Sequence, residues 1–168
     1  MQYRRVKIPG VTYFFTVNLA NRKSALLVEH VDKLKLSFKK VKEKHPFYVR
    51  GIVVLPDHLH VLMTLPSEDA NYSLRWSLIK SDFSRQLVFN EELSLSRKIK
   101  RERGVWQRRF WEHLIRDELG YERHLDYIHY NPVKHGYVAR ASDWKLSSIH
   151  YYINKGVLTA DWAADVEL

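Results

Sequence analysis

Two histidines alternate with apolar residues inside one strongly strand-forming run of this chain. The run spans residues 53–63 (VVLPDHLHVLM), which are mostly apolar and partly β-branched. Since side chains alternate between the two faces of a strand, His58 and His60 point to one face and Leu59 points to the other. Two imidazoles on one strand face are placed to bind one metal ion. The run therefore predicts a buried strand that carries part of a metal site.

A second polar pair lies four positions apart in a segment with helical character. Residues 118–131 predict a helix that ends before Pro132, and Tyr127 and Asn131 share one of its faces. If this helix packs across the histidine strand, a phenol and an amide oxygen meet the two imidazoles. That mixed nitrogen and oxygen set accommodates Mg²⁺ or Mn²⁺. A tyrosine beside a divalent cation indicates attack on a phosphodiester.

The rest of the chain supplies the elements of an α+β fold. Apolar and β-branched runs predict strands over residues 11–19, 47–55, 58–65 and 105–116. Apolar spacings of three and four predict helices over residues 31–45, 72–87 and 118–131. The order matches a ferredoxin-like fold, one antiparallel sheet with helices on one face. The C-terminal helix with Tyr127 is then an addition, and the charged segment 90–103 is predicted to be a mobile loop.

The charge of the chain constrains its partner. Its 168 residues include 28 Lys and Arg against 19 Asp and Glu, a net charge of +9. A charge this large on a small domain indicates a polyanionic partner, although an RNA-binding protein would have a similar composition. Aromatic side chains among the basic ones suit stacking on unpaired bases.

Cysteine content and hydropathy exclude several classes of protein. The chain has no cysteine, which rules out disulfides, thiolate metal sites and cysteine nucleophiles. No run approaches the ~18 apolar residues of a membrane span, and the first residues lack the apolar stretch of a signal peptide. We expect a cytoplasmic protein with no membrane partner.

Other enzyme classes with paired histidines do not fit this sequence. Metallo-β-lactamase-type hydrolases require an aspartate two residues after the second histidine, where this chain has Leu62. Two-histidine phosphoesterases require a second His-x-Ser/Thr motif and zincins require His-Glu-x-x-His, and the sequence contains neither. It also lacks a Gly-x-x-x-x-Gly-Lys loop, which argues against nucleotide hydrolysis of that type.

Three segments together give the sequence a specific resemblance to one family. They are residues 56–60 (PDHLH), 106–113 (WQRRFWEH) and 127–136 (YIHYNPVKHG). In these segments the chain resembles the REP-associated tyrosine transposases, single-tyrosine HUH transposase relatives encoded in bacterial chromosomes. The resemblance extends from about Tyr3 to Trp162, and the third segment is its most specific part.

The resemblance implies a metal-dependent endonuclease and strand-transferase on a ferredoxin-like HUH fold. By resemblance, His58 and His60 are the paired metal ligands, Asn131 is the third ligand and Tyr127 is the nucleophile. Tyr127 would form a 5′-phosphotyrosine link and free a 3′-hydroxyl. The implied substrate is single-stranded DNA of repetitive extragenic palindromes (REP), which folds into hairpins. The implied protein is a monomer rather than a dimer and acts in the bacterial nucleoid.

The resemblance also divides the chain and assigns supporting residues. A basic N-terminal arm (1–10) precedes the HUH tyrosine transposase domain (11–140), and a C-terminal tail (141–168) is expected to contribute to DNA binding. The candidates for DNA contact are Arg4, Arg5, Arg108, Arg109 and Lys134. Asp57 is expected to orient His58 from outside the ligand set. His124, one turn before Tyr127, is expected to orient or deprotonate it.

The alternative function is a non-catalytic hairpin DNA- or RNA-binding protein on a ferredoxin-like fold. RNA-binding modules of this fold place stacking aromatics on the exposed face of the sheet, where this chain has His58 and His60. A rolling-circle replication initiator would use the same chemistry, but it needs an additional region for which 168 residues leave little room. The presence of both histidines, Tyr127 and Asn131 favours the enzyme.

Overall fold

A four-stranded sheet with strand order β2-β3-β1-β4 forms the centre of the protein. The structure is a computed structural model that describes residues 5–88, 95–96 and 104–163. Every neighbouring pair of strands is antiparallel. The strands are β1 (Thr12–Asn18), β2 (Tyr48–Val54), β3 (His58–Thr64) and β4 (Trp111–Leu114). This order, with helices after the first and third strands, is the ferredoxin-like arrangement that the sequence predicts.

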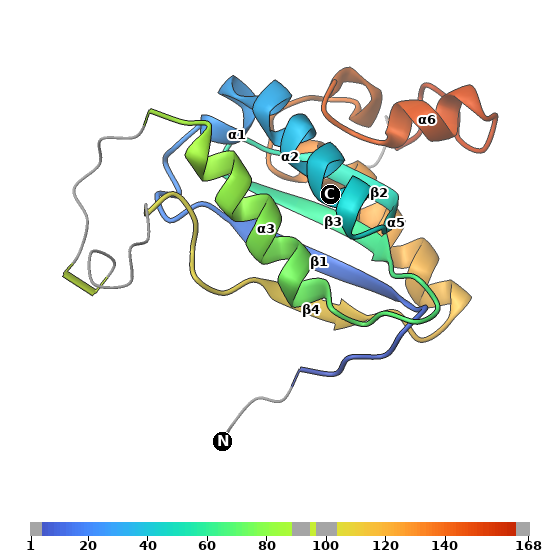
Figure 1. Ribbon diagram of the computed structural model, residues 1–168. Helices are drawn as coiled ribbons and strands as arrows, with labels where there is room; N and C mark the ends of the chain where they lie inside the picture. The colour runs from blue at the N-terminus through green and yellow to red at the C-terminus, as the bar shows by residue number, and fades with distance from the viewer. Residues whose placement is uncertain (1–4, 89–94, 97–103, 164–168) are drawn as a thin grey trace.

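Helices cover both faces of this sheet. Helices α2 and α3 lie side by side on one face, and α5 crosses the opposite face (Figure 1). Asn71 and Asp117 begin α3 and α5, because their side chains accept hydrogen bonds from free backbone N–H groups of the first turn. The helices are α1 (Leu26–Glu29), α2 (Val31–Lys44), α3 (Tyr72–Arg85), α5 (Glu118–Lys134), the 3₁₀ helix η1 (Ala141–Asp143) and α6 (Ile149–Asn154).

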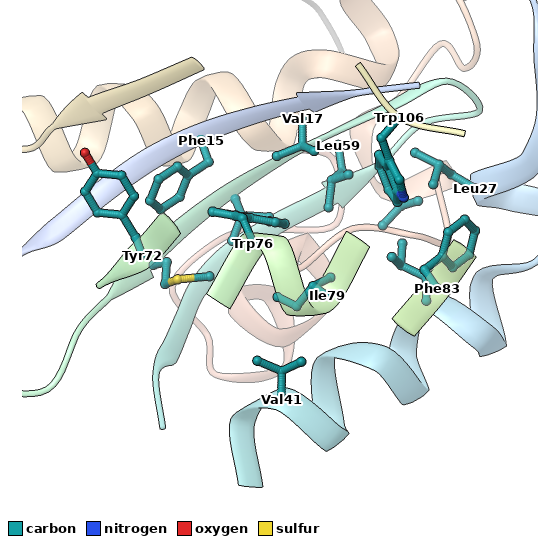
Figure 2. Close-up of a cluster of buried hydrophobic side chains, with 14 of the residues drawn as sticks. Phe15, Val17, Leu27, Val41, Leu59, Tyr72, Trp76, Ile79, Phe83 and Trp106 are labelled. Carbon is teal, nitrogen blue, oxygen red and sulfur yellow. The ribbon is translucent and has the colours of Figure 1, made fainter. Parts of the chain in front are cut away.

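Strand alternation divides the apolar residues between two cores. The larger core lies between the sheet and helices α2 and α3, where Phe15, Val17 and Leu59 pack around Trp76 (Figure 2). The smaller core lies under α5 and contains Phe14, Val53, Leu55, Leu62 and Ile128. His58 and His60 alternate with Leu59, so they point to the α5 side. The pattern that builds the sheet therefore directs both histidines toward the helix that carries Tyr127.

Helix α5 can pack closely on β2 because Gly51 has no side chain. A Cβ atom at Gly51 would lie 2.6 Å from Cδ1 of Leu125 and 3.5 Å from Cδ1 of Ile128. A larger residue at this position would force the Leu125 side chain to move. The outer edge of β2 is also covered, because Val54 N–H donates to the Leu146 carbonyl and Ser148 N–H donates to the Ile52 carbonyl.

Two predicted boundaries are wrong. Helix α5 continues through Pro132 to Lys134, and Pro132 is buried, so packing offsets its missing hydrogen bond. Strand β4 begins only at Trp111, and upstream Trp106 forms an isolated bridge with Leu19. The Lys80 ammonium donates to the carbonyls of the two residues after Trp106 and takes the place of a strand partner.

Some predictions concern residues that are not described. The predicted loop at 90–103 lies outside the described residues except for 95–96, as does the start of the N-terminal arm, residues 1–4. No helix in the described part of the chain is long and apolar enough to cross a membrane.

Candidate active site

The two histidines of β3 lie side by side and buried on the α5 face of the sheet. Their ring centroids are 5.0 Å apart and their planes are nearly perpendicular, at 83°. His58 is paired with Asn18 of β1 and His60 with Thr16. Both residues are buried, with exposed fractions of 5% for His58 and 4% for His60. The prediction that His58 and His60 share a strand face is confirmed.

Neighbouring polar groups hold one nitrogen of each ring. His58 Nδ1 lies 2.8 Å from the Asp57 carboxylate and donates to it, and Asp57 in turn accepts from Arg22 Nε at 2.5 Å. His60 Nδ1 lies 2.8 Å from the Thr16 hydroxyl. Occupying Nδ1 in this way leaves Nε2 of each ring as the free nitrogen. His60 Nε2 is buried without a hydrogen-bond partner among the described residues.

Burial keeps both imidazoles neutral. It lowers the pKa of His58 despite the nearby Asp57 carboxylate, which opposes the shift. Burial, followed by the charges of His58 and His135, lowers the pKa of His60 to about 3. Burial raises the pKa of Asp57, but its hydrogen bonds with Arg22 and His58 outweigh that effect and keep the carboxyl ionised. Neutral imidazole is the form that binds metal ions.

Helix α5 brings Tyr127 to the histidine pair, and Asn131 lies one turn further along the same face of the helix. The Tyr127 ring lies 5.3 Å from the His60 ring and 5.9 Å from Phe14. Its side chain remains 37% exposed, so the phenol can be reached from solvent. The Lys134 ammonium lies over the Tyr127 ring at 4.9 Å and donates to its hydroxyl at 3.5 Å. The predicted packing of this helix across the histidine strand is therefore confirmed.

The free polar atoms around this point fit a divalent metal ion. Asn131 is fully buried, and neither its amide oxygen nor its amide nitrogen has a hydrogen-bond partner within the described chain. Burying a polar group without a hydrogen-bond partner costs free energy. Asn131 and His60 Nε2 are therefore suited to bind a ligand that interacts with these unpartnered atoms. The described residues contain no cluster of three His, Cys, Asp or Glu side chains that could hold a metal ion. A third ligand at this point therefore has to come from another residue type, such as an amide.

Two of the predicted DNA-binding arginines, Arg5 and Arg108, are engaged in contacts within the protein. Arg4 is outside the described residues. Arg5 forms an ion pair with the buried Glu112 at 3.7 Å, and its guanidinium lies 4.0 Å above the Phe110 ring. Arg108 and Arg109 precede β4 instead of lying on a strand, and Arg108 donates to Ser96 at 2.7 Å.

His124 packs differently from what its spacing to Tyr127 predicts. Its Nδ1 donates to the Gly120 carbonyl at 2.7 Å, and its ring lies between Phe14 and His113, 4.9 Å from each. Phe14 also contacts Tyr127, so His124 reaches Tyr127 only through another ring. No hydrogen bond joins His124 to Tyr127 in the described part of the chain, and its role in orienting Tyr127 stays a prediction.

Three residues that the sequence did not single out contribute to the site. Thr16 and Arg22 hold the His60 and Asp57 side chains, and the His135 ring lies 5.3 Å from His58. His135 directly follows the last helical residue and belongs to the same distinctive segment as Tyr127, a signal that could have identified it. Arg22 lies in a polar turn with no comparable signal.

Comparisons with known proteins show the family of this chain. Residues 7–131 match the family described as IS200-like transposases. A REP-associated tyrosine transposase of Escherichia coli K12 is 43% identical over 165 residues, covering 98% of this chain and 92% of the relative. This chain belongs to the REP-associated tyrosine transposases. It is therefore an enzyme that acts on DNA.

Two further matches support membership of the REP-associated tyrosine transposases. A Haemophilus influenzae protein assigned to the same group is 43% identical over 167 residues, covering 99% of this chain and 95% of its own length. The structure of a REP-associated tyrosine transposase bound to a REP hairpin superposes with a TM-score of 0.84 at 42% identity. It covers 100% of this chain and 94% of the other. The ferredoxin-like fold and its C-terminal helix are thus shared with a solved transposase.

Proposed function

We propose that this transposase cleaves and rejoins single-stranded REP-type hairpin DNA through a covalent bond to Tyr127. The observation that carries the proposal is the exposed phenol of Tyr127, 5.3 Å from a buried imidazole pair with a free nitrogen. A phenol is a weak nucleophile without assistance. Here the Lys134 ammonium donates to the phenol oxygen, which holds the Tyr127 side chain in place beside the histidine pair.

We infer that His58, His60 and Asn131 hold a divalent cation, Mg²⁺ or Mn²⁺. When bound, such an ion supplies Lewis-acid stabilisation of charge on the non-bridging phosphate oxygens. The Nε2 atoms of the two rings and the amide oxygen of Asn131 would be the donor atoms of this set. His60 Nε2 and the Asn131 amide have no hydrogen-bond partner among the described residues. Asp57 and Thr16 act as positioning residues, because each fixes the Nδ1 side of one ring.

The proposed cleavage forms one bond and breaks one. The Tyr127 phenol oxygen attacks the phosphorus and loses its proton, the bond from phosphorus to the 3′-oxygen breaks, and the 3′-oxygen leaves as a hydroxyl. The 5′-phosphate remains on Tyr127. Attack by the 3′-hydroxyl of another strand reverses these steps and releases the tyrosine. The bond energy is kept in the phosphotyrosine, so strand transfer needs no nucleotide triphosphate.

The proposed DNA partner follows from charge and from the relative that is bound to a REP hairpin. A net charge of +9 attracts the phosphate backbone. We assign Arg4, Arg5, Arg108, Arg109 and Lys134 to phosphate or base contacts, with His124 supporting Tyr127 through Phe14. Arg5 would have to exchange its bond with Glu112 for a DNA contact. We further propose that the tail at 141–168 contributes to DNA binding and that one monomer acts in the bacterial nucleoid.

A covalent-adduct assay tests this function. The protein is mixed with labelled hairpin DNA from beside its own gene, with Mn²⁺, Mg²⁺ or chelator, and resolved on a denaturing gel. The proposal predicts a shifted band that requires the metal ion, is lost in Tyr127→Phe and persists in Tyr137→Phe, a nearby exposed tyrosine. Tight hairpin binding without an adduct under any condition would contradict the catalytic proposal and favour a binding-only protein.

A further inference from the structure

The edge strand β4 presents a tryptophan on the same face of the sheet as the candidate active site. Trp111 is paired with Thr16 across β4 and β1, and Thr16 is paired with His60 across β1 and β3. Because directly paired residues point to the same face of a sheet, these three side chains form one row. The row spans two strand spacings, about 10 Å from His60 to Trp111.

Trp111 has no structural role that the described residues reveal. Its side chain is 59% exposed, whereas Trp76 and Trp106 are buried in the core beneath α3. The Trp106 indole also donates to the Lys80 carbonyl. Within residues 5–88, 95–96 and 104–163, the Trp111 indole makes no hydrogen bond, ring contact or cation–π contact. Trp111 therefore lies outside both cores of the described protein.

The surroundings of Trp111 match a nucleic-acid base better than an apolar protein partner. The exposed Arg109 lies two residues earlier in the chain, and Lys134 lies beside the Tyr127 hydroxyl at the other side of the site. Cations around an exposed aromatic face are the combination that binds single strands, because the cations meet the phosphates and the ring stacks on a base. A phosphodiester placed against Tyr127 would bring the neighbouring base toward this end of the row.

We propose that Trp111 is a positioning residue that stacks on the unpaired base next to the scissile phosphodiester. This inference rests on the proposed function, since it needs a single strand across the candidate site. Stacking would hold the strand so that its phosphate faces the Tyr127 phenol. It would act on the single-stranded part of the substrate and leave the paired hairpin stem unaffected.

The test separates binding of the single strand from cleavage. Two oligonucleotides are compared, a REP-type hairpin alone and the same hairpin with its single-stranded flank, which carries 2-aminopurine at each flank position in turn. Affinity and 2-aminopurine quenching are measured without metal ion for wild type, Trp111→Ala, Trp111→Phe and Tyr48→Ala. Tyr48 is the matched control, because it is 51% exposed and pairs with Thr64 at the opposite end of β3 from the histidines.

We expect Trp111→Ala to bind the flanked hairpin about 5- to 150-fold more weakly than wild type, the range for losing one stacked base. Affinity for the hairpin alone should not change, and Trp111→Phe should recover most of the loss. Quenching should be strongest at one flank position and disappear in Trp111→Ala, while Tyr48→Ala should resemble wild type.

Three results would overturn the proposal. They are equal affinity of Trp111→Ala and wild type for the flanked hairpin, equal loss for the hairpin alone, and no gain in wild-type affinity from the flank. Adduct formation by wild type with Mn²⁺ is scored separately on the same DNA. An adduct together with an unaffected Trp111→Ala would reject the stacking role and leave the proposed function standing. Flank-dependent stacking without an adduct would support the stacking role of Trp111 and contradict the proposed cleavage.

Discussion

At the scale of single residues, the protein holds one nitrogen of each candidate histidine ligand and leaves the amide of Asn131 without a partner among the described residues. Asp57 and Thr16 fix the Nδ1 atoms of the two histidines, and the Nε2 atom of His60 and the amide of Asn131 have no partner among the described residues. Burial keeps the imidazoles neutral and ready to bind. The proposed metal binding would therefore depend on residues that do not themselves touch the ion.

Replacing Asp57 should weaken metal binding without removing a ligand. Asp57→Ala frees the His58 ring to rotate and leaves Arg22 without its carboxylate partner. We expect about a 10- to 100-fold loss of Mn²⁺ affinity in isothermal titration calorimetry, the usual effect of losing a group that orients a metal-binding histidine. Asp143→Ala, which removes a surface partner of Arg140, is the control. Unchanged affinity in Asp57→Ala would show that His58 needs no such support.

At the scale of elements, the site depends on how closely α5 approaches the sheet. Gly51→Ala would place a methyl group 2.6 Å from Cδ1 of Leu125. Because the clash is with the end of a side chain, we expect a moderate loss in free energy of unfolding, about 1–2 kcal/mol. Denaturant unfolding of the two single variants and the double variant Gly51→Ala/Leu125→Ala measures the coupling. We expect the double variant to lose less free energy of unfolding than the sum of the losses in the two single variants. Strictly additive losses would show that the two positions do not compete for space.

The attachment of α5 to the edge of β2 should also make stability depend on pH. His129 Nε2 lies 2.8 Å from the Ser148 hydroxyl, and burial, with a smaller effect from His150, lowers the pKa of His129 to about 4. Below about pH 6.5, His129 binds a proton in the unfolded chain, where the histidine pKa is near 6.5, but not in the folded chain. The free energy of unfolding therefore falls as pH decreases from about 6.5 to 4. The full loss is ~3 kcal/mol.

Unfolding titrations at several pH values check this dependence. His129→Gln should start less stable near neutral pH and lose less stability on acidification than wild type. Parallel curves for the two proteins would mean that His129 does not carry the effect. His60, with its pKa lowered to about 3, contributes in the same direction in both proteins.

Elements and faces could be predicted from the sequence, and contacts between elements could not. The His58 and His60 pair and the Tyr127 and Asn131 pair are local patterns, so strand and helix periodicity fixes their directions. The hydrogen bonds of Thr16 with His60 and of Arg22 with Asp57 join residues 44 and 35 positions apart. Those contacts depend on strand register and on a turn conformation that no local pattern indicates. The exposure of Trp111 likewise depends on whether a helix covers that end of β4.

At the scale of the whole molecule, the net charge of +9 should control DNA affinity. Lys and Arg side chains release counterions from DNA, so the logarithm of the affinity should fall linearly with the logarithm of the salt concentration. Arg109→Gln should reduce the slope by about one if Arg109 contacts a phosphate. Lys39→Gln on α2, across the sheet from the site, should leave it unchanged. A wild-type affinity that does not respond to salt would contradict the phosphate-contact proposal.

In the proposed mechanism, one tyrosine of this molecule carries the DNA through its 5′-phosphate. Peptide mapping by mass spectrometry of the adduct formed with Mn²⁺ and flanked hairpin DNA identifies the linked residue. We predict a nucleotide linked through its 5′-phosphate to the peptide containing Tyr127, with fragment ions that place the link on that residue. A link on another tyrosine, or a 3′-phosphate link, would contradict the mechanism proposed from the arrangement of Tyr127, His58 and His60.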